Sequence, residues 1–363
     1  MLEVKDLRVV FHTYAGEVKA LDGVNLTLNR REILGLVGES GCGKSVTALA
    51  IAGLLPENAS ANGQITLDGR NLSTLNREEM RQARLKDIAV VFQDPTTYLN
   101  PVFQIGFQIT EALISERQVY ARQLIQQRLQ ELEEDQKRGD RDSQELEIDR
   151  AKLEHSLGSG KLSKGEVKGL AKQVALEYLK LVQLPEPERV FKMYPFELSG
   201  GMRQRAMIAM ALVRRPKVLL ADEISTALDV TVQAQILALL KELRDRIDAA
   251  IILVTHDLAV VSEVCDRVAV MYAGNVVEVA ELRELFANPM HPYTQGLMAA
   301  VPRPDRSSVK LQSITGSVPD LIYPPTGCRF HPRCPKAFAS CSSTKPPLIA
   351  VQKEHGVECL LYG

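Results

Sequence analysis

The chain has 363 residues, 45% of them hydrophobic, so it is long enough to bury a large core and to form more than one domain. Its 44 Lys and Arg residues nearly balance 45 Asp and Glu residues, which leaves no excess of positive charge for binding nucleic acid. The N-terminal segment lacks the pattern of a signal peptide, and no apolar run approaches the ~20 residues that span a bilayer. We therefore expect a protein that is cytosolic or that reaches a membrane through partner subunits.

The first elements along the chain are strands. Residues 2–28 and 64–69 alternate polar and apolar side chains, which predicts an antiparallel sheet. Between them, the apolar run ILGLVG (33–38) predicts a buried strand and VTALAIAGLL (46–55) predicts a helix. Further apolar strands, expected to form a parallel core, begin near Asp87, Lys217, Ala249 and Arg267.

The segment that joins the first buried strand to its helix reads GESGCGKS (38–45) and has the spacing Gly-x4-Gly-Lys-Ser. Glycines let backbone N–H groups turn toward phosphates, and the following helix presents its positive end to them. We expect Lys44 to reach the β- and γ-phosphates of a nucleotide and Ser45 to bind Mg²⁺. The alternative, a glycine-rich turn without a ligand, is disfavoured by the strand, loop and helix context. Cys42 is interpreted as a small filler, not as a nucleophile.

Polar residues at the ends of three later strands complete a site for phosphate hydrolysis. The strand KVLLADE ends in Asp222, expected to hold the Mg²⁺ shell, and Glu223, expected to polarise the attacking water. His256 ends the strand AAIILVTHD and is a candidate contact for the γ-phosphate, although a lone histidine there is more often structural. Gln93 follows the strand DIAVVF and is a candidate ligand of Mg²⁺ or the water, although a lone glutamine is weak support.

A second motif, LSGGMRQR (198–205), opens a helical run. Its SGG supplies unpaired amides and the positive end of a helix dipole, which suit a phosphate. That helix is not expected to reach a nucleotide held by the chain's own glycine loop.

These motifs, in this order, resemble the nucleotide-binding subunits of ATP-binding-cassette (ABC) transporters, and the resemblance covers most of residues 1–302. It implies Walker A at 38–45, a Q-loop at Gln93, the signature motif at 198–202, Walker B at 218–222 with the catalytic Glu223, a D-loop at 226–229 and a switch at His256. One departure is Ile224, where the family usually has proline. We expect it to change the rigidity of the loop without removing catalysis, because both carboxylates remain.

The resemblance implies an α/β fold: a P-loop NTPase (RecA-like) core with an antiparallel β-subdomain, a helical subdomain and a small cysteine-rich C-terminal region. We expect the ATPase domain at 1–300, its helical subdomain at about 94–200 and a C-terminal extension at 301–363. An aromatic residue is implied to stack on adenine; Tyr14 is the first candidate and Phe11 the second, and either could be an ordinary strand residue.

The resemblance also assigns site residues. The implied ATP contacts are Tyr14, Gly38, Ser40, Gly41, Gly43, Lys44, Ser45, Val46 and Asp222. Ser45, Gln93 and Asp222 are the implied Mg²⁺ ligands, and Glu223, His256 and Gln93 the catalytic residues. Ser199, Gly200 and Gly201 are implied to close over the ATP bound to a second subunit, so that hydrolysis requires a head-to-tail pair.

The segment between Gln93 and the signature motif is longer than the family's usual helical subdomain. The additional length falls at residues 115–172, which are dense in Glu, Gln, Lys and Arg. Leucines recur there at helical spacings on either side of RGDRD (138–142), which predicts a projecting helical hairpin. The alternative is a solvated or disordered insert.

Four of the six cysteines lie near the C-terminus, at Cys328, Cys334, Cys341 and Cys359, with the spacing C-x5-C-x6-C-x17-C. Zinc ribbons prefer closer pairs, disulfides are rare in the cytosol, and four thiolates in a loop-rich segment suit an iron–sulfur cluster. Zinc and unligated thiols remain alternatives. His331 and His355 are interpreted as solvated loop histidines, with metal ligation as the alternative, and Cys265 as a core residue.

The stretch HPYT (291–294) and this cysteine spacing resemble the ATPases of dipeptide, oligopeptide and nickel importers. That branch implies ATP, Mg²⁺ and a [4Fe–4S] cluster as cofactors. It also implies a second ATPase subunit that is a different chain, two membrane permeases and an extracellular solute-binding protein, with the chain peripheral on the cytoplasmic face of the membrane. The implied function is ATP hydrolysis that drives peptide or nickel uptake. The alternative function is a soluble ABC ATPase that acts on nucleic acid or ribosomes.

Overall fold

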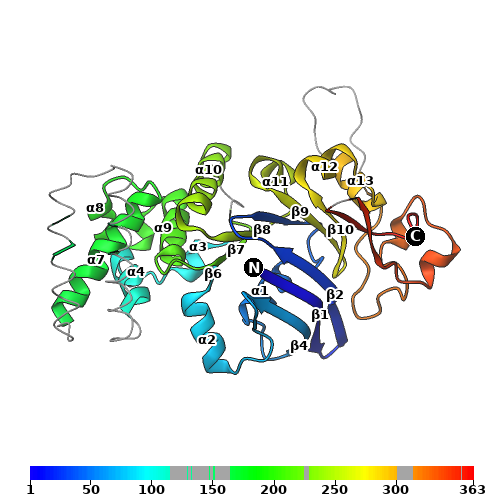
Figure 1. Cartoon of the computed structure of the whole chain (residues 1–363), viewed down its shortest axis with the longest axis horizontal. Helices are drawn as coiled ribbons and strands as arrows, with labels where there is room; N and C mark the ends of the chain where they lie inside the picture. The colour runs from blue at the N-terminus through cyan, green and yellow to red at the C-terminus, as the bar shows by residue number, and fades with distance from the viewer. Residues whose placement is uncertain are drawn as a thin grey trace. The chain divides into compact units, whose positions relative to one another are not determined.

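The computed structural model describes residues 1–114, 164–224, 229–300, 314–352 and 354–363, together with 129, 132, 147, 150 and 151. The described chain forms two compact units (Figure 1): unit 1 comprises Met1–Gln93 and Arg215–Gly363, and unit 2 comprises Asp94–Arg214. Most of the predicted helical insert at 115–172 and of the predicted D-loop at 226–229 lies outside the described residues. None of the described helices is both long enough and apolar enough to cross a membrane.

The larger sheet of unit 1 has eight strands in the order β11-β12-β10-β9-β3-β8-β7-β6. Strand β3 runs parallel to β8 and β9, and β7 runs parallel to β6 and β8, which confirms the predicted parallel core. Strands β3 and β8 are buried along their whole length, because helices and the second sheet cover this part of the sheet. The strands are β3 (Ile33–Val37), β6 (Ile88–Val91), β7 (Val218–Asp222), β8 (Ala250–Thr255), β9 (Arg267–Tyr272), β10 (Asn275–Glu281), β11 (Leu348–Gln352) and β12 (His355–Glu358).

A second, antiparallel sheet has the order β2-β1-β4-β5, as the alternating sequence predicts. Its strands are β1 (Leu2–Thr13), β2 (Gly16–Leu28), β4 (Ala59–Leu67) and β5 (Arg70–Asn71). One buried core joins Val9 and Leu21 of this sheet, Ile51 of helix α1 (Lys44–Ala52), and Leu220 and Ile252 of the larger sheet. The helix that follows the glycine loop is therefore held by both sheets.

The other helices of unit 1 are α2 (Arg77–Lys86), α10 (Val230–Ile247), α11 (Leu258–Val264), α12 (Leu282–Ala287) and α13 (Pro292–Ala299). Aspartates begin two of them: the Asp229 carboxylate accepts the Val232 N–H at 3.0 Å, and the Asp257 carboxylate accepts the Ala259 N–H at 2.8 Å. Cys265 ends α11 and is 6% exposed, which confirms its interpretation as a core residue.

Unit 2 is helical among its described residues. Its helices are α3 (Pro95–Tyr98), α4 (Ile105–Ile114), α7 (Lys164–Leu181), α8 (Pro187–Lys192) and α9 (Gly200–Leu212), with a 3₁₀ turn at Pro195–Glu197. Helix α7 packs against α4, α8 and α9. The buried Arg205 of α9 donates to the Val182 carbonyl at 2.8 Å and so fixes the end of α7 to α9. This is the predicted helical subdomain.

The C-terminal segment extends the larger sheet. Strand β12 pairs with β10, Val279 lying opposite Gly356, and β11 forms the outer edge. The interpretation of His355 as a solvated loop histidine is wrong: it begins β12, is 2% exposed, and its Nε2 lies 2.8 Å from a carboxylate oxygen of the fully buried Glu278. A strand partner distant in sequence determines this environment, so local composition could not predict it.

Candidate active site

The glycine loop runs from β3 to α1, and two of its residues must be glycine. Gly38 has a φ of +153° and Gly43 a φ of +103°, values that L residues rarely adopt. A Cβ on Gly38 would lie 2.2 Å from the Met271 carbonyl oxygen, and one on Gly43 would lie 2.7 Å from Leu21 Cδ2. The loop therefore packs directly against the strands behind it, and any larger residue would displace it.

Two side chains of this loop point inward. Lys44 is 5% exposed, and its Nζ donates to the carbonyls of Gly38 and Glu39 at 2.9 and 3.0 Å. Cys42 is fully buried, and burial raises the pKa of its thiol although the nearby Lys44 lowers it. A buried, protonated thiol is a poor nucleophile, in agreement with the interpretation of Cys42 as a filler.

The start of α1 meets the end of β7. The Ser45 hydroxyl donates to a carboxylate oxygen of Asp222 at 3.0 Å. Burial raises the pKa of Asp222, the Ser45 hydroxyl lowers it, and the adjacent Glu223 raises it again. A hydroxyl and a carboxylate this close together are a suitable pair of oxygen ligands for one Mg²⁺.

Three predicted catalytic side chains meet beside this pair. Gln93 Nε2 donates to Glu223 Oε2 at 3.0 Å, and His256 Nδ1 lies 3.3 Å from Glu223 Oε1. The three residues follow β6, β7 and β8, whose carboxyl ends meet at one edge of the parallel sheet. Glu223 has a φ of +48°, a conformation that is uncommon outside glycine and that concentrates at functional sites.

The remaining predicted ATP contacts lie at the surface of unit 1. Ser40 and Gly41 are exposed at the tip of the glycine loop, and Val46 is half-buried in the first turn of α1. Tyr14 is fully exposed in the turn between β1 and β2, whereas Phe11 is half-buried on β1. An exposed ring is accessible to a base, and adenine stacking by Tyr14 stays a prediction.

The signature residues lie in unit 2, at the start of α9. Ser199 is the N-cap of this helix, and its hydroxyl accepts the Met202 N–H at 3.4 Å. Ser199 and Gly200 are exposed and Gly201 is half-buried. Their contact with the ATP of a second subunit stays a prediction.

The four C-terminal cysteines are free thiols within one segment of unit 1. Burial, opposed by the Phe330 backbone and aided by the other three cysteines, raises the pKa of Cys328 to about 11. The described residues include no group of three or more His, Cys, Asp or Glu side chains that could hold a metal ion. His331 is half-buried in a 3₁₀ turn, and its Nδ1 lies 2.9 Å from the Cys328 carbonyl oxygen.

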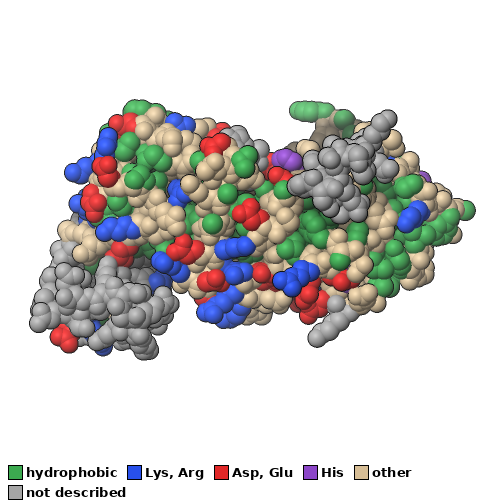
Figure 2. Space-filling model, turned by 90° about the horizontal axis from the view of Figure 1, so that it is seen from above, with side chains coloured by type: hydrophobic (Ala, Val, Ile, Leu, Met, Phe, Trp, Pro, Cys, Tyr) green, Lys and Arg blue, Asp and Glu red, His purple; other side chains and the backbone are tan. Residues whose placement is uncertain are grey.

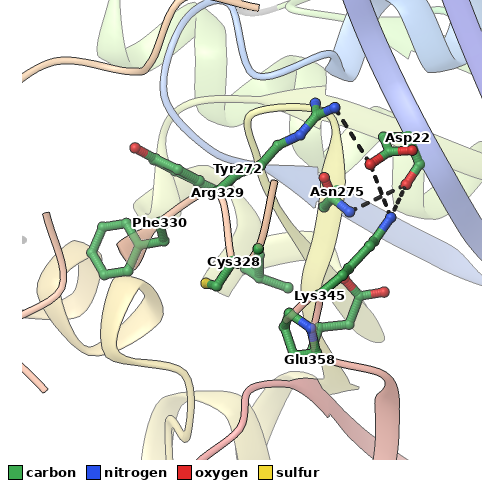
Figure 3. Close-up of a pocket in the computed structure, with 11 residues that line it drawn as sticks. Asp22, Tyr272, Asn275, Cys328, Arg329, Phe330, Lys345 and Glu358 are labelled. Carbon is green, nitrogen blue, oxygen red and sulfur yellow. Dashed lines mark hydrogen bonds and ion pairs between the residues drawn. The ribbon is translucent and has the colours of Figure 1, made fainter. Parts of the chain in front are cut away.

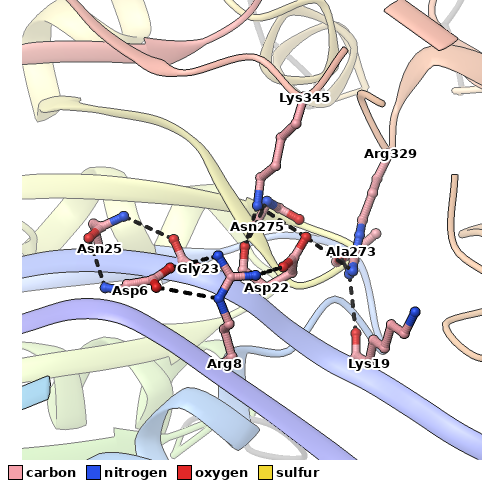
Figure 4. Close-up of polar contacts among 10 residues, drawn as sticks. All are labelled: Asp6, Arg8, Lys19, Asp22, Gly23, Asn25, Ala273, Asn275, Arg329 and Lys345. Atoms are coloured by element: carbon pink, nitrogen blue, oxygen red, sulfur yellow. Dashed lines mark hydrogen bonds and ion pairs between the residues drawn. The ribbon is translucent and has the colours of Figure 1, made fainter. Parts of the chain in front are cut away.

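One polar cluster was not predicted. Figure 4 shows Arg8, Arg329 and Lys345 converging on Asp22 of β2, at 2.6, 3.4 and 3.0 Å. Burial opposes ionisation of Asp22, but the hydrogen bond from Lys345 and the charges of Lys345, Arg329 and Arg8 hold its pKa below the usual range.

The cluster borders a small pocket near the cysteine segment (Figure 3), whose lining includes Tyr272, Cys328 and Glu358. Isolated charged residues far apart in the chain carry no periodic signal, so sequence reasoning could not have brought these groups together.

Comparisons with known proteins agree with this geometry. A sequence family described as "ABC transporter" matches residues 21–226, and one described as "Oligopeptide/dipeptide transporter, C-terminal region" matches residues 277–341. Oligopeptide transport ATP-binding protein OppD of Salmonella typhimurium is 43% identical over 96% of this chain and 90% of that protein. Dipeptide transport ATP-binding protein DppD of Bacillus subtilis is 42% identical over 99% of this chain and 94% of that protein. The solved structure of a dimeric bacterial ABC transporter cassette has a TM-score of 0.58 and 26% identity, covering 78% of this chain and 99% of that one.

The fold, the glycine loop and the carboxylates at the sheet edge define an ABC-type ATPase, and the chain belongs to the ABC transporter family as an ATP-binding subunit. Within that family it groups with the ATP-binding proteins of oligopeptide and dipeptide transport.

Proposed function

We propose that this chain hydrolyses ATP at the edge of the parallel sheet of unit 1 and that the hydrolysis drives peptide uptake. The observation that carries the proposal is the meeting of Ser45 with Asp222 and of Glu223 with Gln93 and His256. Lys44 and the loop amides bind the phosphates, and Ser45, Gln93 and Asp222 hold the Mg²⁺. Glu223 accepts a proton from the attacking water, and His256 orients the γ-phosphate against it.

The coupling to transport follows from the signature motif. Ser199, Gly200 and Gly201 of one subunit close over the ATP of a second ABC ATPase subunit, and we propose that this subunit is a different chain. ATP binding then closes the pair and hydrolysis reopens it. Two membrane permeases and an extracellular solute-binding protein complete the importer, with this chain peripheral on the cytoplasmic face. The names of the relatives, which specify oligopeptide and dipeptide transport, support a peptide as the solute.

The domain boundaries given above, with the ATPase domain at 1–300 and the extension at 301–363, remain part of this proposal. Nucleic acid is not among the proposed partners. The molecular face shown in Figure 2 carries Lys and Arg side chains interspersed with Asp and Glu, in agreement with the near-neutral composition.

Glu223→Gln tests the hydrolytic step, because the amide keeps the shape of the side chain but cannot accept the proton. We expect this variant to bind ATP with the affinity of the natural chain and to lose at least ~100-fold in turnover. In cells that depend on this subunit, labelled peptide should stop accumulating while the assembled transporter is still recovered. Rapid hydrolysis by the variant would remove Glu223 from the role of base, and undiminished peptide uptake would contradict the coupling.

We also propose that Cys328, Cys334, Cys341 and Cys359 hold a [4Fe–4S] cluster. The support is their spacing and their free thiols; in the described structure the side chains are not gathered into a metal-holding group, so the proposal requires the segment to close around the cluster. Such a cluster would cross-link the segment and could exchange an electron.

Chain purified without air should contain about four iron atoms and four acid-labile sulfides. Replacing any one of the four cysteines with serine should lower the iron content, whereas Cys265→Ser should not. Stoichiometric zinc, or no metal at all, in the chain purified without air would refute the cluster.

A further inference from the structure

We propose that Arg333, between the C-terminal cysteines, is a positioning residue for the phosphate loop and links the cysteine segment to the ATP site. The inference rests on the ATP-binding role proposed above. Arg333 donates two hydrogen bonds to the carboxylate of Glu39, the second residue of the loop: Nη1 to Oε2 at 2.6 Å and Nη2 to Oε1 at 3.1 Å. The Arg333 side chain is only 6% exposed and that of Glu39 29% exposed, so water screens the pair weakly.

Arg333 is itself fixed by other contacts. Its Nε donates to the Thr315 carbonyl at 2.9 Å, and Nη1 donates to the Tyr272 hydroxyl at 3.4 Å. The hydrogen bond to Glu39 raises the pKa of Arg333, and an arginine guanidinium is charged at every physiological pH in any case. A planar group held on several sides can hold a carboxylate in one orientation, which a flexible lysine could not do.

Glu39 transmits this restraint to the phosphate-binding lysine. Its backbone N–H donates to the Tyr293 hydroxyl at 2.9 Å, and its carbonyl accepts from Lys44 Nζ at 3.0 Å. Its carboxylate is held by Arg333. Displacing Glu39 therefore displaces a hydrogen-bond partner of Lys44, so Arg333 acts on the phosphate site through Glu39 without touching the nucleotide.

The cysteine segment is attached at the other end of this chain of contacts. Arg333 closes the 3₁₀ turn His331–Arg333, and the next residue, Cys334, donates its N–H to the His331 carbonyl at 3.2 Å. Phe330, at the start of the turn, is 2% exposed, and its ring centroid lies 5.0 Å from that of Tyr272 and 5.3 Å from that of Tyr293. The turn that carries Arg333 thus packs on the same tyrosine that binds the Glu39 amide.

Coupling between two sites is reciprocal. A change at Cys334 that shifts the turn alters ATP binding, and ATP binding in turn orders the cysteine segment.

The test measures the Kd of a fluorescent ATP analogue with Mg²⁺ on the full chain. Arg333→Ala should weaken binding about tenfold, the size of a typical coupling between contacting residues. Arg333→Lys keeps the charge but not the two-point contact. Its Kd should fall between that of the natural chain and that of Arg333→Ala. Lys345→Ala is the matched control, because Lys345 anchors the same segment to Asp22 and does not contact the phosphate loop. Its Kd should stay within about twofold of the natural value.

A double-mutant cycle separates positioning from a general loss of stability. Glu39→Gln should weaken ATP binding like Arg333→Ala, and the double variant should bind no more weakly than either single variant. Glu39→Gln also keeps the test open if Arg333→Ala does not fold. Additive losses, an unchanged Kd in Arg333→Ala, or an equal loss in Lys345→Ala would each overturn the inference.

Hydrogen exchange tests the reciprocal effect. ATP should slow amide exchange across 328–334 in the natural chain and should not do so in Arg333→Ala. If the natural chain binds ATP but amide exchange across 328–334 does not change, the link is refuted. A natural chain that does not bind ATP at all would refute the proposed function instead.

Discussion

His291 shows how burial fixes the protonation state of a single residue. It is 1% exposed at the N-cap of α13, and its Nδ1 accepts the Tyr293 N–H at 3.0 Å. Burial lowers its pKa to about 3, so the ring stays neutral in the folded protein. This neutral ring caps the helix whose Tyr293 binds the Glu39 amide.

The pKa of His291 predicts a loss of stability in mild acid. Below pH ~6.5 the unfolded chain takes up a proton that the folded chain does not, so stability falls as the pH drops from ~6.5 toward ~3. At pH ~5 the loss from this one residue is about 2 kcal/mol. His291→Asn keeps an N-cap acceptor but removes the titration. In urea unfolding, the free energy of unfolding should therefore drop less between pH ~7.5 and pH ~5 in this variant than in the natural chain, by about that amount. The exposed His12→Asn is the control. An unchanged pH dependence in His291→Asn would contradict the prediction.

At the scale of elements, the sequence predicts what local pattern determines. The apolar runs that became β3, β7 and β8 are fully or almost fully buried strands, and such runs need no distant partner to be recognised. Three polar residues at strand ends were predicted to meet, and Gln93, Glu223 and His256 do so, because parallel strands bring their carboxyl ends to one edge.

Elements that depend on distant pairing were predicted less well. The sequence 64–69 predicts a short strand, but β4 begins at Ala59, because the polar ASANG stretch pairs with β1, with Ala59 opposite Phe11. Strand β11 has the largely apolar sequence LIAVQ, but it is short, mostly exposed and follows a proline pair, and no strand was predicted there. Neither the register of such strands nor the partner of His355 is determined by neighbouring residues, because both depend on long-range pairing.

At the scale of the whole molecule, the C-terminal segment lies within unit 1 and is joined to its larger sheet through β12. Glu278 of β10 is fully buried, and its carboxylate accepts the backbone N–H groups of Met290 and His291 at 2.7 and 2.8 Å. Its Oε1 lies 2.8 Å from His355 Nε2, and this contact joins α13 to the added strand β12. Arg329 and Lys345 attach the same segment to Asp22 of the smaller sheet.

We therefore predict that a chain ending at residue 313 will not fold into a stable ATPase, although every nucleotide motif remains. The shortened chain would leave the buried Glu278 carboxylate without its His355 partner, and a buried polar group that loses its hydrogen-bond partner costs about 1–3 kcal/mol. It would also expose the backbone edge of β10, which favours aggregation. Soluble yield, thermal unfolding and ATP affinity should all fall relative to the full chain.

His355→Leu in the full chain isolates the contact between Glu278 and His355 from the loss of the strand. It should lower the unfolding temperature, and the added change Glu278→Gln should recover part of that loss, because the buried charge then disappears. A shortened chain that unfolds at the same temperature as the full one and binds ATP equally well would show that the segment is dispensable. In that case the coupling of the cysteines to the phosphate loop could not be a requirement for the ATP site.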